Sequence, residues 1–179
     1  MSKKLWGGRF AEAMNSDMES FSSSLKDDVH LFKADIAASR AHLHQLEAQG
    51  IVPKQEAEKI DSVLNDLWEE YQKGSFVLSD KFEDIHMNIE NYLIDKLGDL
   101  GKKIHTGRSR NDQVVTAFKL TIMERVDELI LQLKDLLSVL VELAERSMDV
   151  VIPGYTHLQK AQPVRASLYF MAYFEMFYR

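Results

Sequence analysis

Hydrophobic side chains recur at steps of three or four residues over one long stretch in the second half of the chain. From about Asn111 to Ser147 there is no glycine or proline, and the spacing predicts one continuous helix. Its main apolar stripe is formed by Val115, Phe118, Ile122, Val126, Leu129, Leu133, Leu136, Leu140 and Leu143. A second stripe adds Val114, Met123, Ile130, Leu137 and Val141. Such a helix spans roughly 54 Å, and its broad apolar face predicts burial on two sides in a multi-helix bundle shared between subunits.

Three shorter helix patterns precede this stretch, each bounded by residues that commonly begin or end helices. The predicted helices run from Asp27 or Asp28 to Gly50, from Pro53 to Gly74, and from Ser79 or Asp80 to Gly98. We expect the first two to form a helical hairpin. Residues 1–27 lack sustained periodicity, which predicts an extended or irregular arm.

The long helix is followed by a break at residues 151–154, a polar turn at 155–159 and a further predicted helix from near Gln162 and Pro163. Strand alternation reaches a useful length nowhere. The predicted fold class is therefore all-α, with an arm and small helical domain over residues 1–110 and the first long helices of a central multi-helix bundle over residues 111–179. The dense apolar face near the chain end has no returning helix to cover it, which predicts that the bundle domain is truncated.

Composition narrows the function classes. The chain has 179 residues, a net charge of −6 and a pI of about 5.5, with no basic run outside residues 102–110, so nucleic-acid binding is disfavoured. The absence of cysteine excludes a disulfide framework, a thiolate nucleophile and a cysteine zinc site. No signal peptide is visible, and the longest apolar run, 168–177, is too short to span a bilayer and contains Glu175. We expect a cytoplasmic protein that binds neither nucleic acid nor membrane.

A glycine-hinged cationic loop, Lys103–Gln113, runs directly into the long helix and is the first candidate for chemistry. Its capping residues are Ser109, Asn111 and Asp112, and the free N–H groups of a first helical turn attract carboxylate or phosphate. On the functional interpretation, Arg108, Ser109, Arg110 and Asn111 present several donors to a dicarboxylate. On the alternative interpretation, the loop is a helix cap with solvated arginines. Residue spacing alone supports the functional and the helix-cap interpretations about equally.

The six histidines fall into three sets with different expectations. His30, His42 and His44 are expected on the solvated surface of helices. His86 and Glu90 are four residues apart, which suits two metal ligands, but no third ligand accompanies them, so we expect a polar pair on a helix surface and no metal. His105 and His157 lie in polar loops beside glycine and are candidate site residues.

Four motifs together resemble the argininosuccinate lyase family, which includes the delta-crystallins and belongs to the aspartase/fumarase superfamily. The motifs are Leu5–Phe10, Glu83–His86, Thr106–Gln113 and Gly154–Gln159. They occur in the expected order and cover essentially the whole chain, although only the N-terminal portion of the family pattern is present. The resemblance implies a homotetramer whose central helices form one bundle, with each active site built from three chains.

The activity that the resemblance implies is the reversible cleavage of argininosuccinate to arginine and fumarate, in arginine biosynthesis and the urea cycle, with no cofactor. It assigns acid–base work to His157 and substrate contacts to Ser24, Asn111 and Thr156. Four further residues match positions close to the substrate: Ser109, Arg110, Gln159 and His86. The family's Gly-Ser-Ser loop, which carries the serine taken as the base, does not occur in residues 1–179, so we expect the chain alone to be inactive.

Two alternatives stay open at this stage. One is a lyase for a related succinyl compound such as adenylosuccinate, against which the Trp6–Arg9 segment and the Arg108–Arg110 loop argue. The other is a non-catalytic structural protein in the manner of the inactive delta-crystallins, or an oligomerising helical module.

Overall fold

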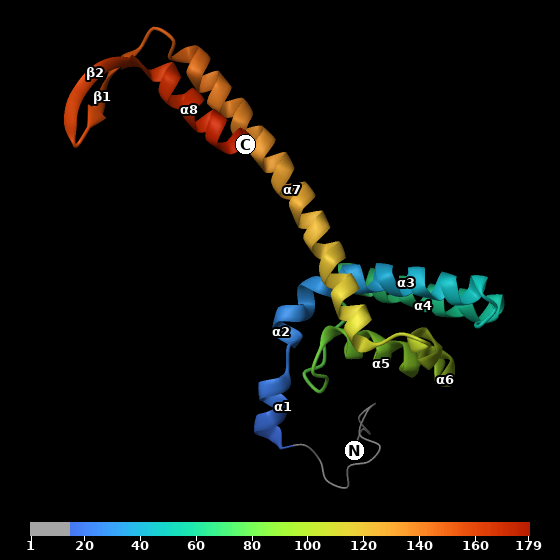
Figure 1. The fold of residues 1–179 in the computed structure, drawn as a ribbon. Coiled ribbons are helices and arrows are strands. Elements are labelled where there is room, and N and C mark those ends of the chain that lie inside the picture. Colours follow the sequence, from blue (N-terminus) through green and yellow to red (C-terminus); the bar gives the residue numbers. More distant parts are fainter. Residues whose placement is uncertain (1–14) are drawn as a thin grey trace. The chain divides into compact units, whose positions relative to one another are not determined.

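The computed structural model describes residues 15–179, which form a largely helical chain with one small β-hairpin (Figure 1). The motif Leu5–Phe10 therefore lies outside the described residues. Two compact units can be distinguished, the first ending at Thr121 and the second running from Ile122 to Arg179. The first contains α1 (Ser16–Ser22), α2 (Leu25–Asp28), the 3-10 turn η1 (Val29–Leu31), α3 (Phe32–Ala48), α4 (Lys54–Gln72), α5 (Ile85–Leu97), α6 (Asp99–Lys102), the 3-10 turn η2 (Lys103–His105) and the start of α7 (Arg110–Arg146).

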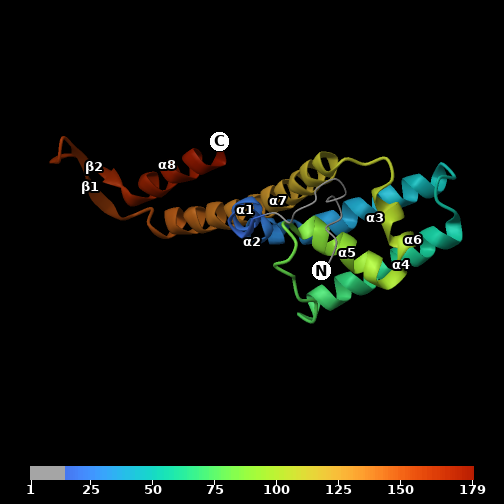
Figure 2. The same cartoon turned by 90° about the horizontal axis from the view of Figure 1, so that it is seen from below.

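The helical hairpin predicted for the first half of the chain is confirmed as α3 and α4, which lie side by side in both views (Figures 1 and 2). Gly50 ends α3 with φ +70°, and Pro53 precedes the first residue of α4. Fully buried leucine and isoleucine side chains fill the space between α3, α4 and α5, together with Phe32, whose ring stacks on Tyr71 at a centroid distance of 3.9 Å. This core fixes α3 and α5 as a rigid support for the loop that follows.

The third predicted helix ends at Gly98 as expected, but its predicted start at Ser79 or Asp80 is wrong. Helix α5 begins at Ile85, because the Asp84 carboxylate caps it by accepting from the backbone N–H of Met87 at 2.6 Å. Asn88 then ties the preceding segment down, since its Oδ1 accepts from the N–H of Ser79 at 2.8 Å. Residues 79–84 consequently form turns in front of the helix.

The arm predicted for residues 1–27 is corrected within the part that the structure describes. Residues 16–22 and 25–28 form α1 and α2, and α1 is capped by Asn15, whose Oδ1 accepts from the N–H of Asp17 at 2.8 Å. Ser24 lies between the two helices, and its N–H donates to the carbonyl of Glu83 at 2.8 Å. The arm is therefore locally helical and attached to the segment before α5.

The long helix is confirmed as α7, a single helix of 37 residues. Its first turns contribute buried Gln113 and Ala117 to the first unit, whereas much of the predicted apolar stripe is exposed in the single chain; Phe118, for example, is 55% exposed. The exposed stripe residues are Val115, Phe118, Ile122, Val126, Leu129 and Leu136.

The second unit corrects the prediction that the chain has no strands. After α7 come β1 (Val151–Thr156) and β2 (Gln159–Arg165), an antiparallel pair, and then α8 (Ala166–Tyr178), which starts three residues after the proline at which a helix was predicted. Both strands are largely exposed, so they carry no alternation of apolar and polar residues that could reveal them. Gly154 permits the pairing, because a Cβ there would lie 2.9 Å from the carbonyl oxygen of Gln162.

Candidate active site

The cationic loop is held in a defined conformation where it enters α7. Gly107 adopts φ +66°, which lets the chain turn out of η2. Ser109 Oγ accepts from the N–H of Asn111 at 3.2 Å, and Asp112 Oδ2 accepts from the N–H of Ser109 at 3.1 Å. This reciprocal capping fixes the first turn of α7 and leaves the Asn111 side chain exposed at its start.

Arg110 is anchored beside this turn by three side chains. Its Nη1 donates to Gln113 Oε1 at 2.9 Å, its Nη2 donates to Glu90 Oε2 at 3.3 Å, and its Nε lies 3.7 Å from Asp84 Oδ2. The two carboxylates belong to α5 and its cap, so the Arg110 guanidinium connects α5 to the start of α7. The side chain of Arg110 remains 31% exposed and can still present N–H groups outward.

Beneath Arg110, three polar side chains from three helices are fully or almost fully buried. Gln113 Nε2 donates to both carboxyl oxygens of Asp35, at 2.8 and 3.0 Å. Asp35 Oδ2 also lies 3.1 Å from His86 Nδ1, and the Asp35 and His86 side chains are both 0% exposed. The expectation that His86 sits on a helix surface is therefore wrong: it is buried beside the Asp35 carboxyl, and neither of its ring nitrogens is hydrogen-bonded.

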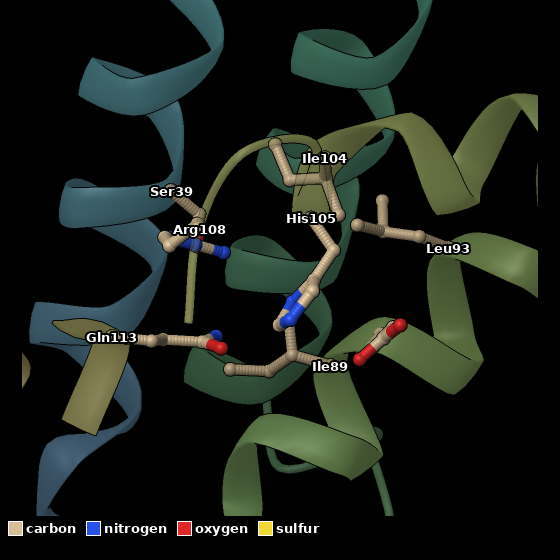
Figure 3. Close-up of a pocket in the computed structure, with 8 residues that line it drawn as sticks. Ser39, Ile89, Leu93, Ile104, His105, Arg108 and Gln113 are labelled. Atoms are coloured by element: carbon tan, nitrogen blue, oxygen red, sulfur yellow. The ribbon is translucent and has the colours of Figure 1, made fainter. Parts of the chain in front are cut away.

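Arg108 is likewise directed inward, so the interpretation of the loop as bearing solvated arginines is wrong for this residue. Its Nη1 and Nη2 donate to Ser39 Oγ, each at 3.2 Å, and burial lowers the pKa of its guanidinium. A cavity of about 10 Å³, room for about one water molecule, lies beside it. Figure 3 shows that His105, Ile89, Leu93 and Gln113 surround this cavity together with Arg108.

His105 is a partly buried histidine at the wall of that cavity. Burial lowers the pKa of its imidazole, Glu90 acts in the opposite direction, and nearby Arg110 and Arg108 lower the pKa further. His42, expected on the surface, is only partly exposed and contacts the loop, since its Nε2 lies 3.0 Å from the carbonyl oxygen of Thr106. The imidazole of His105, within the loop, therefore faces the cavity, and the imidazole of His42, on α3, contacts the loop backbone.

Ser24 lies between α1 and α2, whose residues border a separate and larger cleft. Ser24 Oγ donates to Asp28 Oδ2, which fixes the start of α2. The neighbouring cleft of about 470 Å³ is lined by residues of α1 and α2 and by the segment before α5, including Ser23, Lys26 and Lys81. No motif in the sequence indicated this cleft, because its walls come from two segments about 55 residues apart.

The remaining predicted site residues lie in the second unit, at the turn between β1 and β2. Thr156 and Gln159 are paired across the hairpin, and His157 and Leu158 form its two-residue turn with φ +48° and +62°. Two consecutive positive φ values characterise the turn type that suits a tight antiparallel hairpin, although asparagine and glycine favour it far more than leucine does. All four side chains are exposed, and Leu158 is 97% exposed.

The predicted residues thus divide into two sets. Ser24, His86, Ser109, Arg110 and Asn111 belong to the first unit, and Thr156, His157 and Gln159 belong to the second. Within residues 15–179 no group of three metal-binding side chains comes together, and no helix in that range is long and apolar enough to cross a membrane.

Sequence reasoning missed Asp35 and Ser39, which hold the loop from below. A signal was present, because both residues lie on the same helical repeat as buried Phe32, Ile36 and Leu43. Polar residues that interrupt a buried apolar stripe usually have buried partners.

The sequence model of the family described as Lyase matches residues 8–179, and the chain belongs to that family. More particularly, it is 51% identical over 177 residues to the argininosuccinate lyase of Sulfurihydrogenibium sp., which covers 99% of this chain and 39% of that protein. It is 46% identical over 179 residues to the argininosuccinate lyase of Heliobacterium mobile, covering 100% of this chain and 39% of the relative. The resemblance found in the motifs is confirmed, and the chain spans about 39% of the length of these relatives.

Solved structures agree on the fold. A variant of EDDS lyase with bound fumarate matches with a TM-score of 0.72 and 27% identity, over 84% of this chain and 29% of that chain. A fumarate lyase:delta crystallin from Brucella melitensis matches with a TM-score of 0.72 and 19% identity, over 89% of this chain and 40% of that chain. The predicted class, a helical fold of the aspartase/fumarase type, is thereby confirmed, with the hairpin as an addition.

Proposed function

We propose that this chain supplies the N-terminal segments of an argininosuccinate lyase, which reversibly eliminates arginine from argininosuccinate to give fumarate. The observation that carries the proposal is the identity of 44–51% to argininosuccinate lyases over 98–100% of the chain. The substrate is a small dicarboxylate, and the route served is arginine biosynthesis or the urea cycle in the cytoplasm.

The chemistry requires strong donors around a carboxylate. The proton to be removed lies next to that carboxylate and is barely acidic, so the carbanion must be held as an aci-carboxylate with two negative oxygens. Arg110 and Asn111, at the capped start of α7, supply a guanidinium and an amide there, and the helix N-terminus adds a partial positive charge. Ser109 shapes this turn, and Thr156 and Gln159 from the hairpin add hydrogen-bonding groups.

His157 performs the acid–base work in this proposal. Its imidazole is exposed at the tip of the hairpin, where it is free to protonate the departing guanidinium nitrogen or to orient and activate a partner. The resemblance assigns the base to a serine loop that residues 1–179 do not contain, so we expect no turnover by this chain alone.

Assembly into a homotetramer completes the proposal. The half-exposed apolar residues of α7 and α8 form more uncovered apolar surface than a monomer commonly carries. Packing α7 against its copies in one bundle would bury that surface and bring the loop of one chain near the hairpin of another.

The test mixes this chain with the full-length relative from Sulfurihydrogenibium sp. carrying asparagine at the position that aligns with His157. The ultraviolet absorbance of fumarate is then followed after addition of argininosuccinate. We expect activity in the mixture, none from either protein alone, and none when this chain carries His157→Asn. Silence of the mixture, with mixed oligomers seen by native mass spectrometry, would contradict the proposal.

A further inference from the structure

We propose that Asp35, on α3, is a positioning residue for Arg110. It fixes the orientation of the Gln113 side-chain amide, and that amide in turn holds the Arg110 guanidinium at the start of α7. The inference rests on the proposed function, because it concerns how Arg110 is presented to the substrate carboxylate.

The two ends of the Gln113 side-chain amide have different partners. An amide has a nitrogen end that donates and an oxygen end that accepts. Asp35 accepts from Gln113 Nε2 through both carboxyl oxygens, at 2.8 and 3.0 Å, and Gln113 is only 3% exposed. The Gln113 oxygen must therefore face away from Asp35, and it accepts from Arg110 Nη1 at 2.9 Å.

Part of the Arg110 guanidinium remains free. A guanidinium has five N–H groups; hydrogen bonds to Gln113 and Glu90 use one N–H on Nη1 and one on Nη2, and Nε lies 3.7 Å from Asp84 Oδ2 in an ion pair. Two N–H groups remain on a side chain that is 31% exposed. The buried contacts thus hold one side of the guanidinium and leave the other side for a carboxylate.

Loss of the Asp35 carboxyl would remove the group that orients the Gln113 amide. The Gln113 amide could then rotate by half a turn and direct its nitrogen toward Arg110, where two donors would face each other. His86 does not act as an acceptor for this amide in the structure: its Nδ1 lies 3.1 Å from the Asp35 Oδ2 that accepts from Gln113, and neither of its ring nitrogens forms a hydrogen bond with Gln113. Asp35 therefore determines which end of the amide Arg110 meets.

A reciprocal exchange separates this role from general stabilisation. Gln113→Glu alone sets two carboxyl groups against each other at hydrogen-bond distance, and Asp35→Asn alone lets either end of either amide face the other. In the double variant Asp35→Asn/Gln113→Glu, the amide at position 35 can donate to one carboxyl oxygen at position 113. The other oxygen at position 113 can accept from Arg110. The double variant should restore the hydrogen bond that Arg110 donates to the side chain at position 113, with nearly unchanged side-chain shapes.

The experiment measures kcat and KM of the mixture with the inactivated relative, using each variant of this chain. Asp35→Asn and Gln113→Glu are expected to lower kcat/KM by about 10- to 100-fold, mainly through a higher KM, and the double variant to recover to within about threefold. The matched control is Asp61→Asn, which removes a carboxylate from the Arg40–Asp61 ion pair between α3 and α4, away from the loop. It should leave kcat/KM unchanged within about twofold.

A second readout on the isolated chain keeps the inference distinguishable from the proposed function. Nuclear magnetic resonance should show slow hydrogen exchange at the Gln113 side-chain amide and at Arg110 Nε–H, lost in Asp35→Asn and regained in the double variant. These signals decide the inference even if the wild-type chain restores no activity. The inference would be overturned if the Arg110 signals and kcat/KM were unchanged in Asp35→Asn. It would also be overturned if the double variant were no better than Gln113→Glu, and this comparison holds even where the single variants fold poorly.

Discussion

Gly101→Ala tests the close approach of α6 to the end of α5, on which the position of the cationic loop depends. Gly101 is buried in α6. A Cβ at this position would lie 2.5 Å from the carbonyl oxygen of Leu93, 2.6 Å from its carbonyl carbon and 2.9 Å from the nitrogen of Ile94. All three are backbone atoms of α5, so no side chain can rotate away to make room.

The magnitude follows from two opposing contributions. Ordinary contact requires a separation of about 3.5 Å, so the two helices must move apart by about 1 Å, and overpacking of this kind costs about 1–3 kcal/mol. Alanine is a better helix former than glycine by up to about 1 kcal/mol, which offsets part of the cost. We expect the free energy of unfolding to fall by about 1–2 kcal/mol and Tm to fall by roughly 2–8 °C.

Urea unfolding at one fixed protein concentration measures the change, because self-association makes apparent stability depend on concentration. The matched control is Lys102→Ala, which introduces the same residue in the same helix at an exposed position and removes only a surface ion pair with Asp99. It should change the free energy of unfolding by less than about 0.5 kcal/mol. Equal stability of Gly101→Ala and the wild-type chain would refute the close packing of α5 and α6.

Two further predictions concern the loop and the hairpin. Because the pKa of His105 is lowered in the folded chain below its ordinary value of 6.5, the unfolded chain binds more protons near and below that pH, and stability rises as the pH rises toward 6.5. His105→Gln should reduce this slope in urea midpoints measured from about pH 5 to about pH 7.5, and an unchanged slope would exclude the assigned burial. Leu158 has φ +62°, which strains a leucine but not a glycine, so Leu158→Gly should raise the thermal midpoint slightly while the β-branched Leu158→Val lowers it. The opposite order of the two midpoints would show that the turn is not left-handed at this position.

The elements that the sequence predicts well are those with long apolar repeats or strong end signals. Helix α7 and the hairpin of α3 and α4 follow from spacing, glycine and proline, because the same residues that form the repeat also fill the core. The start of α5 could not be chosen from spacing alone, since Ser79, Asp80 and Asp84 are all good caps and only the contact of Asp84 with the N–H of Met87 separates them.

The rest depends on contacts between residues far apart in the chain. The Gln113–Asp35 hydrogen bonds join residues 78 positions apart, and a charged residue on the core face of α3 does not by itself reveal its partner. The β1–β2 hairpin has no buried residue and is largely exposed, so it lacks the apolar face by which strands are recognised. The inward orientation of Arg108 likewise follows from Ser39 on α3, which nothing in the loop sequence indicates.

The central claim is that this chain contributes to cleavage of argininosuccinate in particular. The most direct measurement is the proton magnetic resonance spectrum of products formed by the mixture of this chain with the His157-equivalent variant of the Sulfurihydrogenibium relative, given argininosuccinate or adenylosuccinate in parallel. We predict arginine and fumarate in equal amounts from argininosuccinate, and no fumarate from adenylosuccinate. Fumarate from adenylosuccinate alone, or from neither compound while mixed oligomers are present, would contradict the account.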